Sequence, residues 1–489
     1  MNITIQKAKN EEETAVIDGH FLHSNYAPKK EAERFVENLK LPYQPSSIII
    51  TEAGLSYSAE FLRKKYPGIK IGVIRYTDFF NSYNSNFDFV LTYYDHPDFE
   101  AYLERQLNEE DLLTSFFTPW PASSQIFTET DNKVWNAIKA SMLRAKTILI
   151  TRQYFEKKWF LNSCTFIKNI SSVISFTDRI EKDVLIISSG PSLLPFIKLI
   201  QENQNRYFII CLSSAISVCL KNGIMPDLCM STDGGYWAGQ HLKALYKNSI
   251  PLAMPPEAYC PNKLLSKLEI LPLDYGDGPS SEILGQTKLP SLKALRNGTI
   301  SGTALSFAAM YFTGSVYFAG LDMACRKGYQ HSQPNQLEFN SCLNDNRIKN
   351  KATRLSRSEL TNGSLDIYRD WFINNPVKDG QRNFYRLINP EDRNNNLGWI
   401  KDIDTKTFFD LIKDNKNCKA FTYKLQPKQA DTDEILKLLS DSKACEKWKR
   451  QFFPLDYIQL SHNPSNTEVN DKIEKEWKQL KEKAEKILK

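Results

Sequence analysis

The chain has 489 residues, of which 41% are hydrophobic and 25% are charged, the proportions of an ordinary soluble globular protein. This length predicts about two to four domains. A net charge of +6 is modest for the length, so we expect no nucleic-acid partner.

The nine cysteines are scattered, and none forms a C-x-x-C pair. This pattern predicts reduced cysteines and neither a disulfide framework nor a metal site. The first residues, MNITIQKAKNEEET, lack an apolar signal core, and no stretch approaches the length of a transmembrane helix. We therefore expect a cytoplasmic protein with no membrane partner, and its oligomeric state stays open.

Residues 1–130 alternate between strand-like and helix-like patterns, which predicts a small α/β domain with parallel pairing. The turn EAGLS after Thr51 has one glycine and no basic residue, so it is either an ordinary turn or a nucleotide site. The stretch FFTPWP at 116–121 is expected to be a loop. The helix and strands expected here are Ala32–Leu39, Ser46–Ile50, a helix-like stretch to Lys65, Ile69–Ile74 and Phe87–Tyr93.

Residues 131–175 predict a helical linker, because apolar side chains recur at three and four residues with no proline inside. Residues 401–489 predict a helical C-terminal region with helices at Thr432–Phe452 and Ser465–Leu488. The apolar stripe of the second helix favours packing on the body of the protein or on a copy of it.

Residues 176–400 form the best organised segment, with continuous apolar strands separated by helices. The pattern predicts a Rossmann-like parallel sheet covered on both faces, with ligands at the carboxyl ends of the strands. The basic segment Arg326–Arg357 reads as a loop or lid, and Phe384–Ile388 as an edge strand. The expected elements are Val184–Ile187, Leu193–Ile200, Tyr207–Leu212, Ala215–Leu220, Asp227–Thr232, Leu252–Met254, Leu268–Leu271, Ser301–Phe312, Ser315–Met323 and the helix Leu365–Ile373.

Known phosphate loops are absent from the sequence, which has neither GxGxxG nor GxxxxGK[ST]. Glycine, serine and carboxylate residues instead follow successive elements. Together these corners suggest a nucleotide cleft, because hydroxyls and backbone N–H groups bind phosphate and ribose. The corners are Ser189-Gly190-Pro191-Ser192, Ser213-Ser214, Asp233-Gly234-Gly235, Gly298 to Gly302 with Ser301, and Gly320-Leu321-Asp322.

Three side chains are candidates for chemistry, each with a plainer alternative. Asp233 either contacts ribose or a metal, or begins an Asx-type turn before two glycines. Asp322 either belongs to the site or caps the next turn. His331, in a polar loop after a strong strand, is either a general base or a solvated histidine.

The order of SSGPSL, CLSSA, GIMPDLCMSTDGG, GTISGTALSFAAMYF, VYFAGLDM and YQHS resembles the motility-associated factor (Maf) family. These are flagellin glycosyltransferases whose central domain is MptE-like. The same order resembles the bacterial CMP-sialic acid-dependent sialyltransferases, whose turn GNGPSL looks like the stretch ending at Leu193. Ser213 and Asp233 stand where those enzymes carry asparagine.

The resemblance implies a cytoplasmic enzyme, needed for flagellar assembly and motility, with no tightly bound cofactor. It would move a nonulosonic acid of pseudaminic, legionaminic or sialic type from a CMP-sugar to Ser or Thr of flagellin. The implied catalytic residues are His331, Asp233 and Asp322. The residues implied to bind the CMP-sugar are Ser189, Gly190, Pro191, Ser192, Ser213, Ser214, Asp233, Ser301 and Gly302.

Two other functions remain open at this point. One is an MptE-like 6-hydroxymethylpterin pyrophosphokinase, which would use ATP and Mg²⁺ and make Asp233 and Asp322 metal-associated. The other is a non-catalytic module that binds flagellin.

Overall fold

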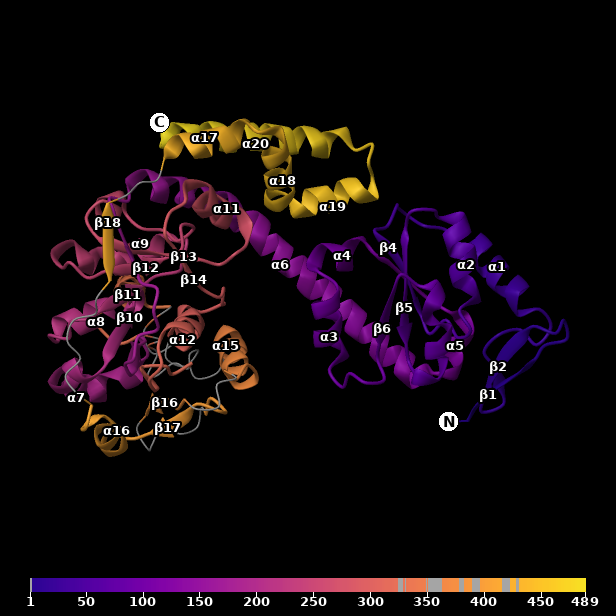
Figure 1. Cartoon of the computed structure of the whole chain (residues 1–489), viewed down its shortest axis with the longest axis horizontal. Helices are drawn as coiled ribbons and strands as arrows, with labels where there is room; N and C mark the ends of the chain where they lie inside the picture. The colour runs from indigo at the N-terminus through magenta and orange to yellow at the C-terminus, as the bar shows by residue number, and fades with distance from the viewer. Residues whose placement is uncertain are drawn as a thin grey trace. The chain divides into compact units, whose positions relative to one another are not determined.

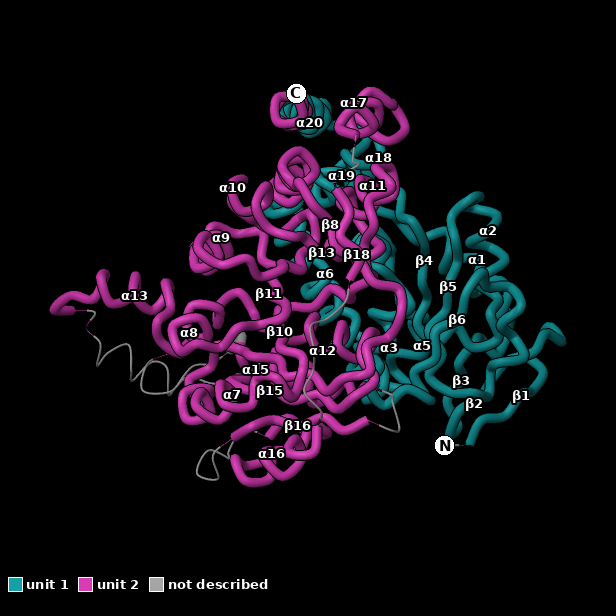
Figure 2. Tube along the Cα trace, turned by 60° about the vertical axis from the view of Figure 1, so that its left-hand side comes forward, with its two compact units in different colours: residues 1–156, 446–479 teal, residues 157–445, 480–489 magenta. Residues whose placement is uncertain are grey.

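The computed structural model describes residues 2–323, 329, 331–348, 350, 363–377, 382–388, 396–415, 423–427 and 431–489. They form two compact units, one of residues 1–156 and 446–479 and the other of residues 157–445 and 480–489 (Figure 2). The division into four segments that we expect from the sequence, at residues 1–130, 131–175, 176–400 and 401–489, stays a prediction. Within the described residues, every helix is too short or too polar to span a bilayer.

Unit 1 contains a parallel sheet of β4 (Ser47–Thr51), β5 (Lys70–Arg75), β6 (Phe89–Thr92) and β7 (Phe116–Pro119), in the order β6-β5-β4-β7. Strands β4, β5 and β6 of this sheet are labelled in Figure 1. The predicted α/β character is confirmed. An unpredicted antiparallel sheet precedes it, formed by β1 (Ile3–Lys7), β2 (Glu13–Ile17) and β3 (His20–Phe21). The helices are α1 (Pro28–Asn38), α2 (Tyr57–Lys65), η1 (Asp78–Asn86), α3 (Phe99–Gln106), α4 (Glu109–Thr114) and α5 (Pro121–Ile126).

The expectation of a loop at FFTPWP is wrong, because Phe116 pairs with Ile48 and begins strand β7. Aromatic and threonine side chains favour strands. Pro119 is tolerated because it ends a strand at the edge of the sheet, where a missing N–H breaks no interior ladder.

The helical stretches at the linker and the C-terminus are confirmed with changed limits. One helix, α6 (Thr128–Asn169), covers residues 131–169 of the expected linker 131–175, and the end of that range, Ser172–Ser175, is a strand. The expected helix Thr432–Phe452 is two helices, α17 (Thr432–Ser440) and α18 (Ser442–Phe452). Asp441 separates them, since its backbone is extended and its carboxylate accepts from Ala444 N at 2.7 Å, as an N-cap does.

Two further helices complete this region. Helix α19 (Pro454–His462) was not predicted, whereas α20 (Thr467–Leu488) confirms the helix expected at Ser465–Leu488. The apolar stripe of α20 packs on the protein's own body. Trp477 contacts Trp448, with ring centroids 6.5 Å apart, and Phe452, at 5.9 Å.

Unit 2 is built on a long sheet in the order β17-β16-β15-β9-β10-β11-β12-β13-β8-β18, with β14 paired to β13. Its neighbouring strands are parallel except for β18, which runs antiparallel to β8. The strands are β8 (Ser172–Ser175), β9 (Val184–Ile187), β10 (Phe208–Leu212), β11 (Leu228–Met230), β12 (Leu252–Met254), β13 (Glu269–Asp274), β14 (Leu292–Lys293), β15 (Val316–Ala319), β16 (Phe384–Leu387), β17 (Lys401–Ile403) and β18 (Lys424–Pro427). The predicted Rossmann-like parallel sheet is confirmed.

The helices of unit 2 follow the predicted alternation, with one correction in the segment expected to be a loop or lid. There, α13 (Gln336–Leu343) is a helix begun by Asn335, whose side chain accepts from Leu337 N. Residues 326–328, 330, 349 and 351–357 of that segment lie outside the described residues. The remaining elements are η2 (Pro191–Phe196), α7 (Ile197–Asn203), η3 (Gln204–Arg206), η4 (Ser213–Ala215), α8 (Ile216–Lys221), α9 (Tyr236–Leu242), η5 (Lys243–Lys247), α10 (Asn262–Leu265), α11 (Gly278–Thr287), α12 (Ile300–Tyr311), α15 (Gly363–Asn374) and α16 (Thr405–Ile412).

The expected edge strand β16 is an interior strand between β15 and β17, so the edge prediction is wrong. The missed neighbour, β17, is a three-residue strand of sequence KDI, too short and polar for the apolar pattern to reveal.

Strand β9 is the point where the direction of winding reverses. The chain fills one side of β9 with β10 to β13 and the other side with β15 to β17. Connections leave β9 and β15 in opposite directions, so a crevice opens beyond their carboxyl ends, where open α/β sheets bind ligands.

Candidate functional site

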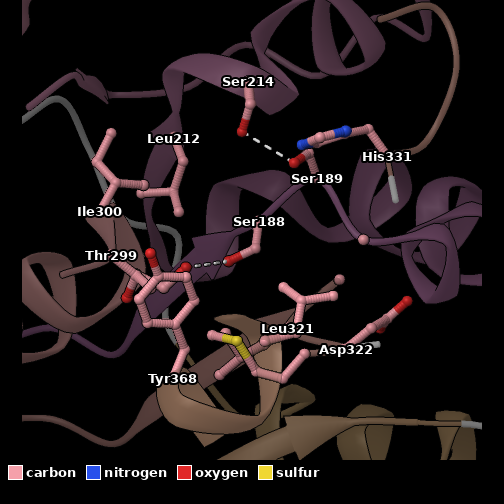
Figure 3. A pocket seen from close by; sticks show the side chains of 15 residues that line it. Ser188, Ser189, Leu212, Ser214, Thr299, Ile300, Leu321, Asp322, His331 and Tyr368 are labelled. Carbon is pink, nitrogen blue, oxygen red and sulfur yellow. Dashed lines mark hydrogen bonds between the residues drawn. The ribbon is translucent and has the colours of Figure 1, made fainter. Parts of the chain in front are cut away.

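A pocket of about 190 Å³ lies at this reversal point, beyond the carboxyl ends of β9, β10 and β15 (Figure 3). Its walls come from four turns and two helices of unit 2. The lining residues are Ser188, Ser189, Gly190, Leu212, Ser214, Thr299, Ile300, Ser301, Gly320, Leu321, Asp322, Met323, His331, Leu365 and Tyr368.

Two glycines let the ends of β9 and β15 meet behind the pocket. Gly190 N donates to Gly320 O at 2.8 Å, and a Cβ on Gly190 would lie 2.4 Å from that oxygen. Gly320 has φ +72°, and its own Cβ would lie 2.4 Å from Ser188 O. Gly190 is therefore required by the protein's own backbone, where the sequence suggested an approach to a ligand anion.

The turn after β9 also uses its remaining N–H groups internally. Ser192 N donates to Asp322 Oδ2 at 2.8 Å, and Ser192 Oγ donates to Oδ1 of the same carboxylate. Leu193 N donates to Gly190 O at 3.0 Å, and Pro191 has no N–H. Asp322 thus takes the capping role, at the helix start where a phosphate was expected, and Pro191 and Ser192 are not among the lining residues.

A buried arginine fixes the segment that carries Asp322. Arg386, on β16, donates to both oxygens of Asp402 at 2.7 and 2.8 Å. Its third nitrogen donates to Leu321 O at 3.3 Å. The bidentate pair with Asp402 fixes the guanidinium, and its bond to Leu321 O holds the end of β15 in place. The sequence offered no signal for this, because the three residues come from separate segments.

Hydroxyl groups line the wall on either side of Ser188 and Ser189. Ser188 Oγ lies 3.3 Å from Ser301 Oγ, and Ser214 Oγ donates to Ser189 Oγ at 2.9 Å (Figure 3). Helix α12 begins here, so its positive end lies at the pocket. The wall suits an anionic or hydroxyl-rich ligand.

Two of the expected binding residues lie behind this wall. Ser213 is buried and is not among the lining residues. Gly302 lies one position beyond the lining residue Ser301, where its N–H donates to the Thr299 Oγ1 cap at 3.1 Å. Their effect on a ligand would be indirect, through Ser214 and Thr299.

His331 lines the pocket and is oriented by a carboxylate. Its Nδ1 lies 3.2 Å from Glu338 Oε1, which also accepts from His331 N at 3.1 Å. The His331 and Glu338 side chains are 22% and 7% exposed. Because Glu338 occupies Nδ1, Nε2 is the ring nitrogen left for proton transfer.

Ser332 ties His331 to the turn after β9. Its N–H donates to Ser189 O at 2.5 Å, and its Oγ donates to Gly190 O at 2.7 Å. The sequence analysis did not single out Glu338, although it lies three residues after the Asn335 cap, which is the spacing of a capping box. The signal was hidden in a segment expected to be a loop.

Asp233 does not line the pocket. It is exposed, and its Oδ1 accepts from Gly235 N at 2.8 Å, the geometry of the Asx-type turn. The charge of Asp233 acts on His241, whose ring centroid lies 6.5 Å from that of His331. Burial first, and the charge of His331 second, lower the pKa of His241 to about 4, and the charge of Asp233 opposes the shift. His241 is neutral at neutral pH.

The described residues include no cluster of three or more His, Cys, Asp or Glu side chains arranged for a metal ion. Asp322 is the carboxylate among the lining residues of the pocket, and it is bonded to Ser192.

Comparisons with known proteins show what this part of the chain is similar to. Residues 158–328 match the family model described as 6-hydroxymethylpterin diphosphokinase MptE-like. Two uncharacterised proteins of Treponema pallidum (strain Nichols) are similar, one 29% identical over 285 residues and the other 25% identical over 131 residues. These matches cover 58% and 26% of this chain, and 62% and 60% of the relatives, less than two thirds of their length.

A solved structure extends the likeness to almost the whole chain. The Maf glycosyltransferase of Magnetospirillum magneticum AMB-1 has a similar fold, with a TM-score of 0.51 and 13% identity over 99% of this chain and 90% of that one. At this identity the likeness speaks for the fold. The resemblance to the Maf family predicted from the sequence is thus confirmed, by an MptE-like central domain and by the fold.

Proposed function

We propose that this protein is a glycosyltransferase that moves a nonulosonic acid from a CMP-sugar to Ser or Thr hydroxyls of flagellin in the cytoplasm. The observation that carries the proposal is the hydroxyl-lined pocket at the reversal point of the sheet, with the His331–Glu338 pair at its wall. The fold shared with a Maf glycosyltransferase supports it.

In this reaction the bond between the anomeric carbon and the phosphate oxygen breaks, and CMP leaves with the bonding electrons. The acceptor oxygen forms the new bond to the anomeric carbon, and its proton passes to His331 Nε2. Glu338, 3.2 Å from Nδ1, stabilises the imidazolium that results. The serine hydroxyls and the start of α12 stabilise the charge on the departing phosphate.

The volume of the pocket limits how much of the CMP-sugar donor it can hold. Its 190 Å³ is below the range of about 300–1,000 Å³ usual for whole ligands, so it fits one part of the donor. In this proposal Asp322 shapes the site through Ser192, and Asp233 acts only through its charge near His241.

A second candidate is a 6-hydroxymethylpterin diphosphokinase that uses ATP and Mg²⁺. The match of residues 158–328 to the MptE-like model favours it. It predicts a pterin diphosphate product and loss of activity in EDTA.

The test supplies the purified chain with flagellin and a CMP-nonulosonate, and separately with ATP, Mg²⁺ and the pterin. We expect the intact mass of flagellin to rise by one or more nonulosonate units as CMP is released, also in EDTA. Flagellin from a strain without this protein should lack that mass. A pterin diphosphate with unmodified flagellin would establish the second candidate, and no product in either mixture would favour a binding module.

Replacement of the base tests the mechanism. His331→Ala should lower the transfer rate by about 10²- to 10⁴-fold, the usual contribution of general base catalysis, with CMP binding kept. His20→Ala, at an exposed histidine of β3, is the matched control. Near-normal turnover of His331→Ala would remove His331 from the mechanism.

A further inference from the structure

A groove of about 800 Å³ lies beside the pocket, between α8, α9, η5 and α13 of unit 2. None of the motifs that pointed to the nucleotide cleft lies in it. The lining residues are Ser217, Leu220, Gln240, Lys243, Ala244, Tyr246, Lys247, Asn248, Gln333, Pro334, Asn335, Gln336, Phe339 and Cys342.

The lining of the groove carries positive charge. Lys243 and Lys247 stand four residues apart on η5, and both are exposed. Lys267, bonded to Tyr246 O at 2.7 Å, adds a third cation near them. Among the described residues that line the groove there is no Asp or Glu. An acidic ligand therefore complements it.

The floor of the groove is apolar and open to water. Phe339 is 57% exposed and Tyr246 is 40% exposed, and Leu220 and Pro334 lie in the same lining. Aromatic surface beside lysines suits a polypeptide segment that alternates apolar and acidic side chains.

The groove and the pocket share one wall. Glu338 pairs with His331 on the pocket side of α13, and the next residue, Phe339, lines the groove. Asn335 lines the groove while donating to the carbonyl of Ser214, which lines the pocket, at 3.0 Å. Gln333 is two residues from His331, so their Cα atoms are at most about 7.6 Å apart. A segment in the groove can bring a hydroxyl to His331 within a few residues.

We propose that this groove docks an extended acidic segment of the acceptor polypeptide and presents its Ser or Thr hydroxyl to His331. The inference rests on the proposed transfer, since it assigns the acceptor side of the same site.

The test is fluorescence anisotropy of the full chain with a short labelled peptide of Asp, Phe, Leu and Ser. We expect saturable binding that Lys243→Glu with Lys247→Glu weakens about tenfold or more at low salt, because attraction becomes repulsion at two sites. The same peptide with Lys in place of Asp should not bind. A photoreactive phenylalanine analogue at position 339 should cross-link to the bound acidic peptide.

The controls separate this inference from the proposed function. Lys401→Glu with Lys406→Glu makes the same charge change at exposed sites on β17 and α16, and should leave peptide binding unchanged. CMP binding should be equal in all three proteins. If the acidic peptide does not bind, or if both double variants weaken it equally, the docking inference is overturned even where CMP transfer is observed. If CMP-sugar is not used but the groove binds as described, the transfer proposal fails and the docking surface stands.

Discussion

In two parallel sheets of this chain, the direction in which successive strands are added reverses at a central strand. The two reversal points differ in what occupies them. In unit 1, β4 lies between β5 and β7; in unit 2, β9 lies between β10 and β15. Each central strand runs into a turn that contains glycine and serine. The first reversal point is filled by a buried ion pair of charged side chains, and the second leaves a pocket.

The filled reversal point holds Glu52 and Arg75, both 0% exposed. The carboxylate accepts from Arg75 Nη1 at 2.9 Å, from Tyr76 N at 2.7 Å and from Gly54 N at 3.2 Å. Arg75 also donates to Ser56 Oγ at 2.6 Å. Within the EAGLS turn, Gly54 N donates to Glu52 and Leu55 N to His23, so these N–H groups are already used inside the protein. The turn is therefore the ordinary turn of the two possibilities.

The open reversal point differs in where its carboxylate lies. Asp322 binds Ser192, one turn into the chain after β9, and leaves the hydroxyls of Ser188, Ser189 and Ser214 on the pocket wall. Topology thus supplies a crevice in both units, and the side chains at the strand ends decide whether it stays available.

The largest effect should come from breaking the filled reversal point. Glu52→Ala leaves a buried guanidinium without its carboxylate, which should lower the free energy of unfolding of unit 1 by about 3–5 kcal/mol in urea titrations. Glu129→Ala removes an exposed partner of Lys133 and should leave the unfolding midpoint unchanged. A loss below about 1 kcal/mol for Glu52→Ala would mean that the pair does not seal the crevice.

Acid should weaken the same unit through His23. Its Nε2 accepts from Leu55 N at 2.9 Å, and burial, with Arg75 second, lowers the pKa of His23 to about 3. An unfolded histidine binds a proton below about pH 6.5, so stability falls as pH falls from 6.5 toward 3.

At pH 5 this loss should reach about 2 kcal/mol relative to pH 7.5. His23→Gln, which keeps an acceptor for Leu55 N but cannot titrate, should remove that part of the pH dependence in urea titrations. His241, the buried histidine of unit 2, titrates alike in both proteins. Equal pH slopes for the two proteins would contradict the burial of a neutral His23.

The smallest effect concerns the open reversal point. Glu338→Gln keeps a hydrogen-bond acceptor near His331 Nδ1 but removes the charge, so kcat of transfer should fall about tenfold, or about 1.4 kcal/mol. KM for the donor should stay unchanged, because Glu338 is not among the pocket residues. A rise in KM with unchanged kcat would make Glu338 a binding residue instead.

The sequence predicted the central sheet well because its strands are continuous buried runs. β12 matches the expected Leu252–Met254 without change, and β9 matches Val184–Ile187. Short polar strands such as β17 were not predicted, and neither was β7, which lies in the stretch FFTPWP that was expected to be a loop.

The site was predicted in its location and less well in its contacts. Ser189, Gly190, Ser214, Ser301 and His331 do gather at one sheet edge, as parallel topology requires. The hydrogen-bond partners of these residues depend on the order of the strands and on side chains that are far away in the sequence. Asp322 and Ser192 are 130 residues apart in the sequence. Their hydrogen bond uses the Ser192 N–H group, which was expected to bind a phosphate.

The most direct test of the open reversal point is calorimetric titration of CMP into the full chain and into Ile300→Trp. Ile300 lines the pocket at the start of α12, and an indole there would fill much of its 190 Å³. Ile150→Trp, on an exposed position of α6, is the matched control. We predict saturable binding of one CMP to the wild type and to Ile150→Trp, and none to Ile300→Trp. Wild-type affinity in Ile300→Trp, or no binding to the wild type, would contradict the assignment of the nucleotide to this pocket.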